Sequence, residues 1–338
     1  MGKKERTQII SGIEKERNSR LITYVAGDRR GLETRIASDI FPLFFEHLSK
    51  IGHQDSIDLF LYSTGGITMA GYGLVNLMRE YCDKLTVMIP FKAYSCATLI
   101  SLGADQIIMT RMGQLSPIDP SVNHPLGPTV QTPNQPGLMT NVPVNVEDVV
   151  GYLDLGKKQA NLRDEDMVKA FEQISTRVNP IALGAVYRAR EQISFLAKTL
   201  LSYHIEDEGK VDSIVNTLTK ERFSHDYLIG RKEAKEVLKL KVIDISDKLD
   251  KNIVALYQEY RNLLFLDTPY SPDVFLQASQ VQTGNFDRGI IESEPLTHVY
   301  RTTKEVKRVQ VTQPGIPAPI MGFQERVLSE GWIIDNSI

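Results

Sequence analysis

The sequence predicts an α/β protein built on a parallel sheet, and two observations lead to this fold class. Short, nearly continuous apolar runs typical of buried strands alternate with segments whose apolar residues recur at helical spacing. The alternation is regular between residues 21 and 109, which is the pattern of strands joined by helical crossovers. Beyond residue 143 the chain is mostly helical, so we expect a helical C-terminal half.

Each element of the first part has its own signal. Residues 1–20 are charged and predicted to be helical. The strands expected next are 21–26, 57–62, 84–89 and 106–109, and the helices between them are 33–51, 69–81 and 95–103. Seven prolines between residues 117 and 143 should exclude regular structure and indicate a long surface loop.

The second part is divided by a change of composition at residue 267. Helices are expected at 164–177, 180–204, 208–220, 231–239 and 247–265, with a strand at 242–244. From residue 267 onward Pro, Gly, Gln and Thr become frequent, and 298–302 is the one strand-like run. We therefore expect a domain over residues 1–266 and a small C-terminal appendage of unknown role over residues 267–338.

Composition excludes several classes of protein. The 338 residues include 39 basic and 42 acidic ones, so a net charge of −3 gives no general attraction to nucleic acid or anionic membrane. No apolar run approaches the ~20 residues that span a bilayer, and the first residues lack a signal peptide's apolar segment. The two cysteines, Cys82 and Cys96, are too few for a disulfide framework or a zinc site. A cytoplasmic protein without a membrane span is expected.

The first motif with chemical potential is Ser63-Thr-Gly-Gly66, between a strand and a helix. Two glycines there let the backbone approach a ligand and leave peptide N–H groups at a helix N-terminus, although a simple tight turn would look the same. Nucleotide binding fails on spacing, because the Lys-Ser/Thr of a P-loop and a G-x-G-x-x-G pattern are both absent.

The second motif is Ala93-Tyr-Ser-Cys-Ala-Thr98, at the next strand-to-helix junction. It brings Ser95 to the same sheet edge, where ligands bind in open α/β sheets. Taken alone, Ser95 could simply cap its helix, since serine is a favoured N-cap residue.

Together the two motifs resemble the Clp protease/crotonase-like fold of repeated ββα units. Residues 57–120 are similar to the Clp proteolytic subunit and to signal peptide peptidase A, and most similar to the serine dehydrogenase proteinase family of the same clan. The matching text is Asp58-Leu-Phe-Leu-Tyr-Ser-Thr-Gly-Gly66, Pro90-Phe-Lys-Ala-Tyr-Ser-Cys-Ala-Thr98, Leu102-Gly-Ala-Asp-Gln-Ile-Ile-Met109 and Leu115-Ser-Pro-Ile-Asp-Pro120. A weaker match over 223–236 extends the resemblance to about residues 20–245.

The resemblance implies a serine-type endopeptidase with Ser95 as nucleophile. It also implies an oxyanion hole formed by the peptide N–H groups of Gly66 and Cys96, which agrees with what an acyl-transfer intermediate requires. The Cys96 thiol, one residue into an apolar helix, should point into the core. No cofactor is expected, because neither a pyridoxal nor a nicotinamide binding pattern is present, and the scattered histidines predict no metal.

The general base is the point where the sequence departs from its relatives, because Asp119 stands where the Clp subunit has its histidine. Lys158, or its neighbour Lys157, lies in a segment resembling the one that carries the lysine base of peptide peptidase A. A second candidate is His225 with Asp226. A third is His124 in the proline-rich loop.

Three functions remain open at this stage. The first is a peptidase acting on peptide or protein substrates, assembled as a homo-oligomer: a trimer, a hexamer or a larger ring. The helix at 180–204 supports assembly, because its apolar residues cover more than one face and need a second surface. The alternatives are a crotonase-type acyl-CoA enzyme and a non-catalytic Clp-like assembly or binding subunit.

Overall fold

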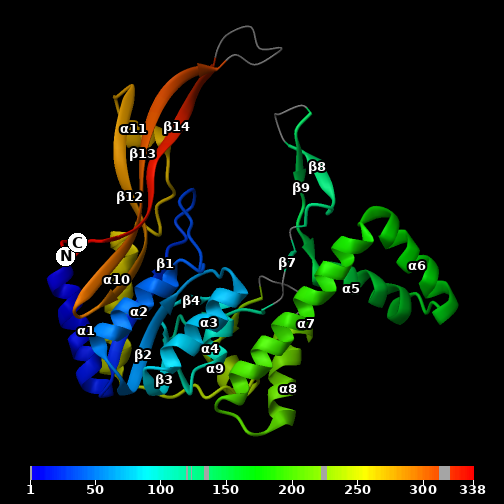
Figure 1. The fold of residues 1–338 in the computed structure, drawn as a ribbon, viewed down its shortest axis with the longest axis horizontal. Coiled ribbons are helices and arrows are strands. Elements are labelled where there is room, and N and C mark those ends of the chain that lie inside the picture. Colours follow the sequence, from blue (N-terminus) through cyan, green and yellow to red (C-terminus); the bar gives the residue numbers. More distant parts are fainter. Residues whose placement is uncertain (1, 119–120, 123, 133–136, 222–226, 312–319) are drawn as a thin grey trace. The chain divides into compact units, whose positions relative to one another are not determined.

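The computed structural model describes residues 2–118, 121–122, 124–132, 137–221, 227–311 and 320–338. The chain forms two compact units. Unit 1 comprises Met1–Leu115, Gly230–Lys235 and Leu240–Ile338, and unit 2 comprises Ser116–Ile229 and Glu236–Lys239. Figure 1 shows their elements coloured along the sequence.

Unit 1 is built on a seven-stranded mixed sheet with the order β14-β13-β12-β1-β2-β3-β5. Its parallel part consists of β1 (Arg20–Ala26), β2 (Gln54–Tyr62), β3 (Cys82–Ile89) and β5 (Gln106–Met109). The antiparallel part consists of β12 (Val281–Ser293), β13 (Leu296–Val311) and β14 (Ile320–Ile334). The α/β class and the four parallel strands expected from the sequence are confirmed.

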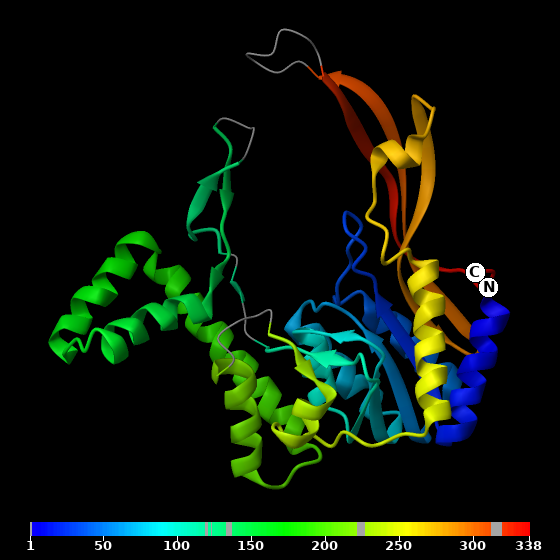
Figure 2. The ribbon, with the colours of Figure 1, turned by 180° about the vertical axis from the view of Figure 1, so that it is seen from behind.

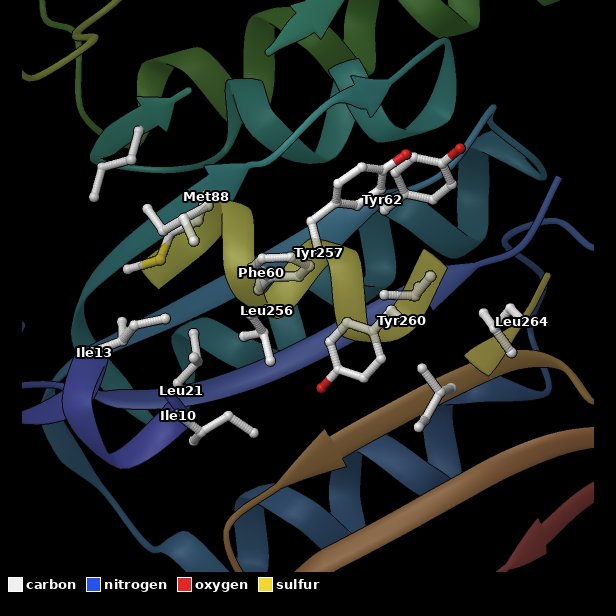
Figure 3. Close-up of a cluster of buried hydrophobic side chains, with 14 of the residues drawn as sticks. Ile10, Ile13, Leu21, Phe60, Tyr62, Met88, Leu256, Tyr257, Tyr260 and Leu264 are labelled. Carbon is white, nitrogen blue, oxygen red and sulfur yellow. The ribbon is translucent and has the colours of Figure 1, made fainter. Parts of the chain in front are cut away.

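Helices cover both faces of the parallel strands, as Figure 2 shows from behind. Helices α1 (Lys3–Arg17) and α10 (Asp247–Leu263) lie side by side on one face, where Leu21 and Val25 of β1 join their buried cluster. Figure 3 shows the side chains of that cluster between α10 and the strands. Because strand side chains alternate, Tyr24 points to the opposite face, where its ring meets Phe44 of α2 (Ile40–Ile51).

The helix expected over residues 33–51 begins only at Ile40. Ile36 instead forms a parallel bridge with Gly66: the Ile36 N–H donates to Gly65 O at 2.9 Å, and the Ile67 N–H donates to Ile36 O at 2.8 Å. A helical Ile36 could not make these bonds, so tertiary pairing overrides the local helical spacing. The strand expected at 242–244 is likewise reduced to one bridge between Ile107 and Val242.

Residues 267–338 lie within unit 1, so the expected boundary at residue 266 does not coincide with the division of the structure. β12 extends the main sheet by pairing antiparallel with β1, with Thr23 opposite Glu292. Ile290 and Ile291 are fully buried there. The short helix α11 (Pro272–Leu276) precedes β12. Because β12 buries apolar side chains on both of its faces, this segment joins the core.

Unit 2 is mainly helical. Its helices are α5 (Val146–Asp154), α6 (Asp164–Arg177), α7 (Pro180–Ser202) and α8 (Glu208–Asn216), with π-helical turns at Leu155–Gln159 and Thr217–Glu221. Short elements β11 (Ile229–Gly230) and α9 (Arg231–Glu236) lead back to unit 1. The helices expected at 164–177 and 180–204 are confirmed to within two residues.

The expectation that prolines exclude regular structure from residues 117–143 is wrong. β7 (Ser121–Val122) pairs with β10 (Val144–Asn145), and β8 (Thr129–Gln131) pairs with β9 (Met139–Asn141). Pro128 immediately precedes β8, and Pro143 lies between β9 and β10. Prolines at strand ends remove no ladder hydrogen bond, so the segment forms narrow hairpins despite them.

A chain of buried polar side chains joins α2 to the C-terminal strands. His47 Nδ1 lies 2.6 Å from Ser293 Oγ, and His47 Nε2 lies 3.1 Å from His298 Nδ1. His298 Nε2 is 3.3 Å from Glu46 Oε2 at the surface. Burial, followed by the neighbouring His298, lowers the pKa of His47 to about 3, and burial also lowers the pKa of His298.

This histidine pair should make the protein lose stability in mild acid. A folded-state pKa below the ordinary 6.5 gives stability that is complete above that value and is lost as the pH falls toward 3. From His47 alone we expect the free energy of unfolding to fall by roughly 2 kcal/mol between pH 8 and pH 5. Urea unfolding at both pH values measures it.

The matched variants are His47→Asn and His53→Asn. Asn does not titrate, so His47→Asn should lose most of this pH dependence, while being less stable at pH 8. His53 is 58% exposed, and its replacement should leave the dependence unchanged. An unaltered dependence in His47→Asn would contradict the assignment.

Candidate active site

Two loops meet at the carboxyl edge of the parallel strands. The first follows β2 and carries Ser63 to Gly66, and the second follows β3 and the short strand β4 (Lys92–Ala93). Backbone hydrogen bonds join them directly: Ser63 N–H donates to Lys92 O at 2.9 Å, and Tyr94 N–H donates to Ser63 O at 3.0 Å. The two motifs identified in the sequence are therefore neighbours in space.

Ser95 has an unusual backbone conformation, with φ 51° and ψ −112°. The Ala97 N–H donates to Tyr94 O at 2.9 Å, so Ser95 occupies the first central position of a turn that favours glycine there. A non-glycine residue in such a region costs of order 1–3 kcal/mol. Its side chain makes no capping hydrogen bond to α4 (Cys96–Leu102), so the interpretation of Ser95 as a simple helix cap fails.

The glycine pair packs directly against this serine. Gly65 has φ 121°, and a Cβ added to it would lie 3.0 Å from Ser95 Cβ and 3.4 Å from Ser95 Oγ. At Gly66 an added Cβ would lie 2.1 Å from the carbonyl oxygen of Ile36. Glycine is therefore required at both positions by close approach of other chain segments.

The bridge to Ile36 also fixes the direction of the Gly66 amide. In this parallel bridge Ile36 makes both hydrogen bonds: its N–H donates to the Gly65 carbonyl, and its own carbonyl accepts from the Ile67 N–H. The N–H of Gly66 therefore points to the other side of its strand, away from Ile36. The second expected donor, the Cys96 N–H, is the first of helix α4, whose leading N–H groups have no acceptor within the helix.

Cys96 directs its thiol away from any reactive role. The side chain is 2% exposed, and its Sγ donates to Ile67 O at 3.3 Å. It also fills the space beside Gly71 of α3 (Thr68–Arg79), where an added Cβ would lie 2.5 Å from Sγ. Burial raises the pKa of the Cys96 thiol to about 12, so it stays protonated at neutral pH.

The candidate bases lie outside unit 1. Lys158 is in the π-helical turn of unit 2, where its 68% exposed side chain pairs with Asp154 at 2.7 Å. Lys157 pairs with Asp164 at 3.0 Å. The His124 Nδ1 accepts the Leu126 N–H at 3.1 Å within its own turn.

Three further residues from the sequence analysis, Asp119, His225 and Asp226, fall outside the described residues. Within the described ranges, no group of three or more His, Cys, Asp or Glu side chains is arranged to hold a metal ion. In the same part of the chain no helix is both long and apolar enough to cross a membrane.

Two polar residues support the loops: Ser63, which the sequence analysis names only as part of the first motif, and Asp28, which sequence reasoning did not single out. Ser63 Oγ is fully buried and accepts the Gly65 N–H at 3.0 Å. Asp28, just beyond β1, accepts from Tyr62 Oη at 2.7 Å and from Lys92 Nζ at 2.6 Å. These partners are 34 and 64 residues from Asp28 in the sequence, so no local spacing signals the cluster.

A glycine loop and a strained serine turn thus meet at the carboxyl edge of the parallel strands. Residues 2–137 match the family described as ClpP-like SDH-type serine proteinase. The resemblance identified in the sequence is thereby confirmed for this part of the chain. The matched region contains Gly66, Ser95 and His124 but ends before Lys158 and His225.

Two relatives come from Methanocaldococcus jannaschii and are described as uncharacterized. MJ0137 is 24% identical over 206 residues, and the match covers 61% of this chain and 58% of the relative. MJ1495 is 23% identical over 283 residues, covering 79% of this chain and 82% of the relative. A solved structure, a mutant of the 1510-N membrane-bound stomatin-specific protease, aligns with a TM-score of 0.38 and 14% identity, covering 68% of this chain and 83% of that one.

Gly66→Ala should disrupt the site through a backbone clash. The added methyl would overlap Ile36 O and N, at 2.1 and 2.5 Å, and relief requires breaking the bridge, at a cost of about 3 kcal/mol. Gly230→Ala is the control, because Gly230 has no positive φ and nothing lies within 4 Å of an added Cβ. That variant should change the free energy of unfolding by less than ~1 kcal/mol. Equal losses in denaturant unfolding would refute the close-approach argument.

Proposed function

We propose that this protein is a serine peptidase that cleaves peptide bonds through an acyl-enzyme on Ser95. Ser95 Oγ attacks the scissile carbonyl, a general base takes the hydroxyl proton, and the proton is passed to the leaving amine. Water then attacks the ester with help from the same base, which releases the second product and restores the serine. The family match over residues 2–137 supports a peptidase.

The observation that carries the proposal is the strained turn at Ser95. Ser95 is held at φ 51° and ψ −112°, a backbone conformation that glycine would adopt at lower cost. Strain of this kind is retained where a side chain must be presented at a fixed position, as in the nucleophile elbow of other hydrolases.

The oxyanion hole in this proposal consists of the Gly66 and Cys96 N–H groups. Gly66 N–H is aimed away from Ile36, and Cys96 N–H lies at the start of α4, where the helix dipole also favours negative charge. Two fixed donors beside the serine stabilise the tetrahedral intermediate without reorganising during the reaction.

For the base we propose Lys158, with His225 and Asp226 or His124 as the alternatives. A lysine acts as a base only when it loses its charge, which requires removal from water. Lys158 is exposed and paired with Asp154 in the isolated chain. In this proposal a second copy of the chain covers it and breaks the pair.

Assembly as a cyclic homo-oligomer is supported by the apolar surface of unit 2. α6 has no buried residue, and its Val168 and Phe171 are 58% and 53% exposed. On α7, eight side chains are buried within the unit, but Tyr187 and Phe195 are 66% and 65% exposed. Apolar surfaces of this kind mark interaction sites.

Both cysteines are buried free thiols, which suits the reducing cytoplasm that we propose as the location.

Two other functions share this fold. A crotonase-type acyl-CoA enzyme would use the two-peptide oxyanion hole with carboxylates in place of an activated serine. A non-catalytic assembly subunit would keep the turn without a competent base. Covalent labelling by a fluorophosphonate distinguishes the peptidase from both, because only the peptidase has an activated hydroxyl.

Ser95→Ala should abolish fluorophosphonate labelling and peptide hydrolysis while leaving the protein folded. Ser101→Ala is the matched control, since Ser101 lies in the same helix and only donates to Ala97 O at 2.8 Å. We expect that variant to be labelled at the wild-type rate. Labelling of Ser95→Ala, measured by intact-protein mass, would disprove the nucleophile assignment.

Lys158→Met should reduce the hydrolysis rate at least about 100-fold, the usual range for loss of a general base. The activity of the wild-type protein should rise with pH, because a lysine acts as a base only in its uncharged form. Lys157→Met is the control, because this neighbour has similar exposure and a similar ion pair. Measured rates for His225→Ala and His124→Ala should stay near wild type. If either histidine proves essential and Lys158 does not, the role belongs to that histidine.

A further inference from the structure

The two site loops are joined by one short bridge, which lies just before they diverge. Ser63 bonds to Lys92 and Tyr94 through the backbone. Gly66 lies three residues beyond Ser63, and Ser95 lies two residues beyond its bridge partner Ala93. A small rotation at the bridge would therefore change the separation between the serine and its N–H donors.

A single carboxylate holds the same two chain segments together through side chains. Asp28 Oδ1 accepts from Tyr62 Oη, and Asp28 Oδ2 accepts from Lys92 Nζ, at 2.7 and 2.6 Å. Tyr62 directly precedes Ser63, and Lys92 directly precedes the bridged Ala93. Asp28 itself comes from a third strand end, so it connects three neighbouring segments of the edge.

The surroundings make this cluster rigid. The side chains of Lys92 and Asp28 are only 26% and 14% exposed, and Lys92 Nζ lies 5.2 Å from the ring centre of Phe91. The centre of the Tyr62 ring lies 5.4 Å from that of Tyr257 on α10. Figure 3 shows the two rings next to each other. Burial and the Asp28 charge raise the pKa of Tyr62, which keeps its hydroxyl protonated as a donor. Charge-assisted bonds in such a site are stronger than exposed ones.

We propose that Asp28, through its bonds to Tyr62 and Lys92, is a positioning residue that sets the distance between Ser95 and the oxyanion donors. This inference rests on the proposed peptidase function. Asp28 takes no part in proton transfer; it acts through the two segments that it joins. Catalysis is sensitive to such placement, because a displacement of about 1 Å can reduce a rate ~100-fold.

The test compares Asp28→Asn with Asp105→Asn. Asp105 also pairs with a cationic side chain, Arg79 at 3.2 Å, and is 21% exposed, but it precedes β5 at the opposite edge of the sheet. We expect Asp28→Asn to lower kcat and the fluorophosphonate labelling rate by about tenfold or more, with KM within about twofold. Asp105→Asn should lower the midpoint of denaturant unfolding at least as much as Asp28→Asn does, while its kcat stays within about twofold of the wild-type value.

A double-mutant cycle with Lys92→Met examines the mechanism of positioning. If Asp28 acts through Lys92, the double variant should be no slower than the slower single variant, because both remove the same contact. Wild-type rates in folded Asp28→Asn would overturn the inference while leaving the peptidase intact. Equal rate losses in Asp105→Asn would also overturn it, since the effect would then follow stability. A wild-type protein that is neither labelled nor active would overturn both this inference and the proposed function.

Discussion

The contact on which the site depends is the close approach of Ile36 to Gly66. Two backbone hydrogen bonds hold these segments together, and their separation leaves no room for a side chain at Gly66. The contact has two effects. It prevents helix α2 from beginning before Ile40, and it turns the Gly66 N–H toward the opposite side of its strand, away from Ile36. One steric constraint thus determines both a helix boundary and the direction of a hydrogen-bond donor.

The sequence predicts the parallel strands and the two loops well, because both depend on local patterns. Buried strands such as 57–62 are nearly continuous apolar runs, and Gly-Gly and Ser at strand ends are visible without tertiary information. The clan resemblance rests on the same stretch, and the family match covers it. Even so, the local pattern is consistent with a capping role for Ser95, and only the structure argues against that role, through the φ and ψ angles and the lack of a capping hydrogen bond to α4.

Other features could not be predicted because they depend on pairing between distant segments. β12 falls in the expected appendage, since nothing in its composition shows that it pairs with β1. Asp28 looks like a turn residue in the sequence, because its two partners are far away along the chain. The general base is a different case: Lys158 lies in unit 2 and His225 outside the described residues.

The pairing of β1 with β12 has a consequence for how the chain folds. The Thr23 hydroxyl bonds to the Glu292 carbonyl across 269 residues, and α1 packs on α10 in the same unit. Unit 2 is inserted between these segments and consists largely of consecutive helices. Contacts close in sequence form quickly, whereas closing a long loop carries an entropic cost that slows folding. During synthesis the inserted unit can become ordered first, and β1 gains its antiparallel neighbour β12 only after most of the chain has emerged.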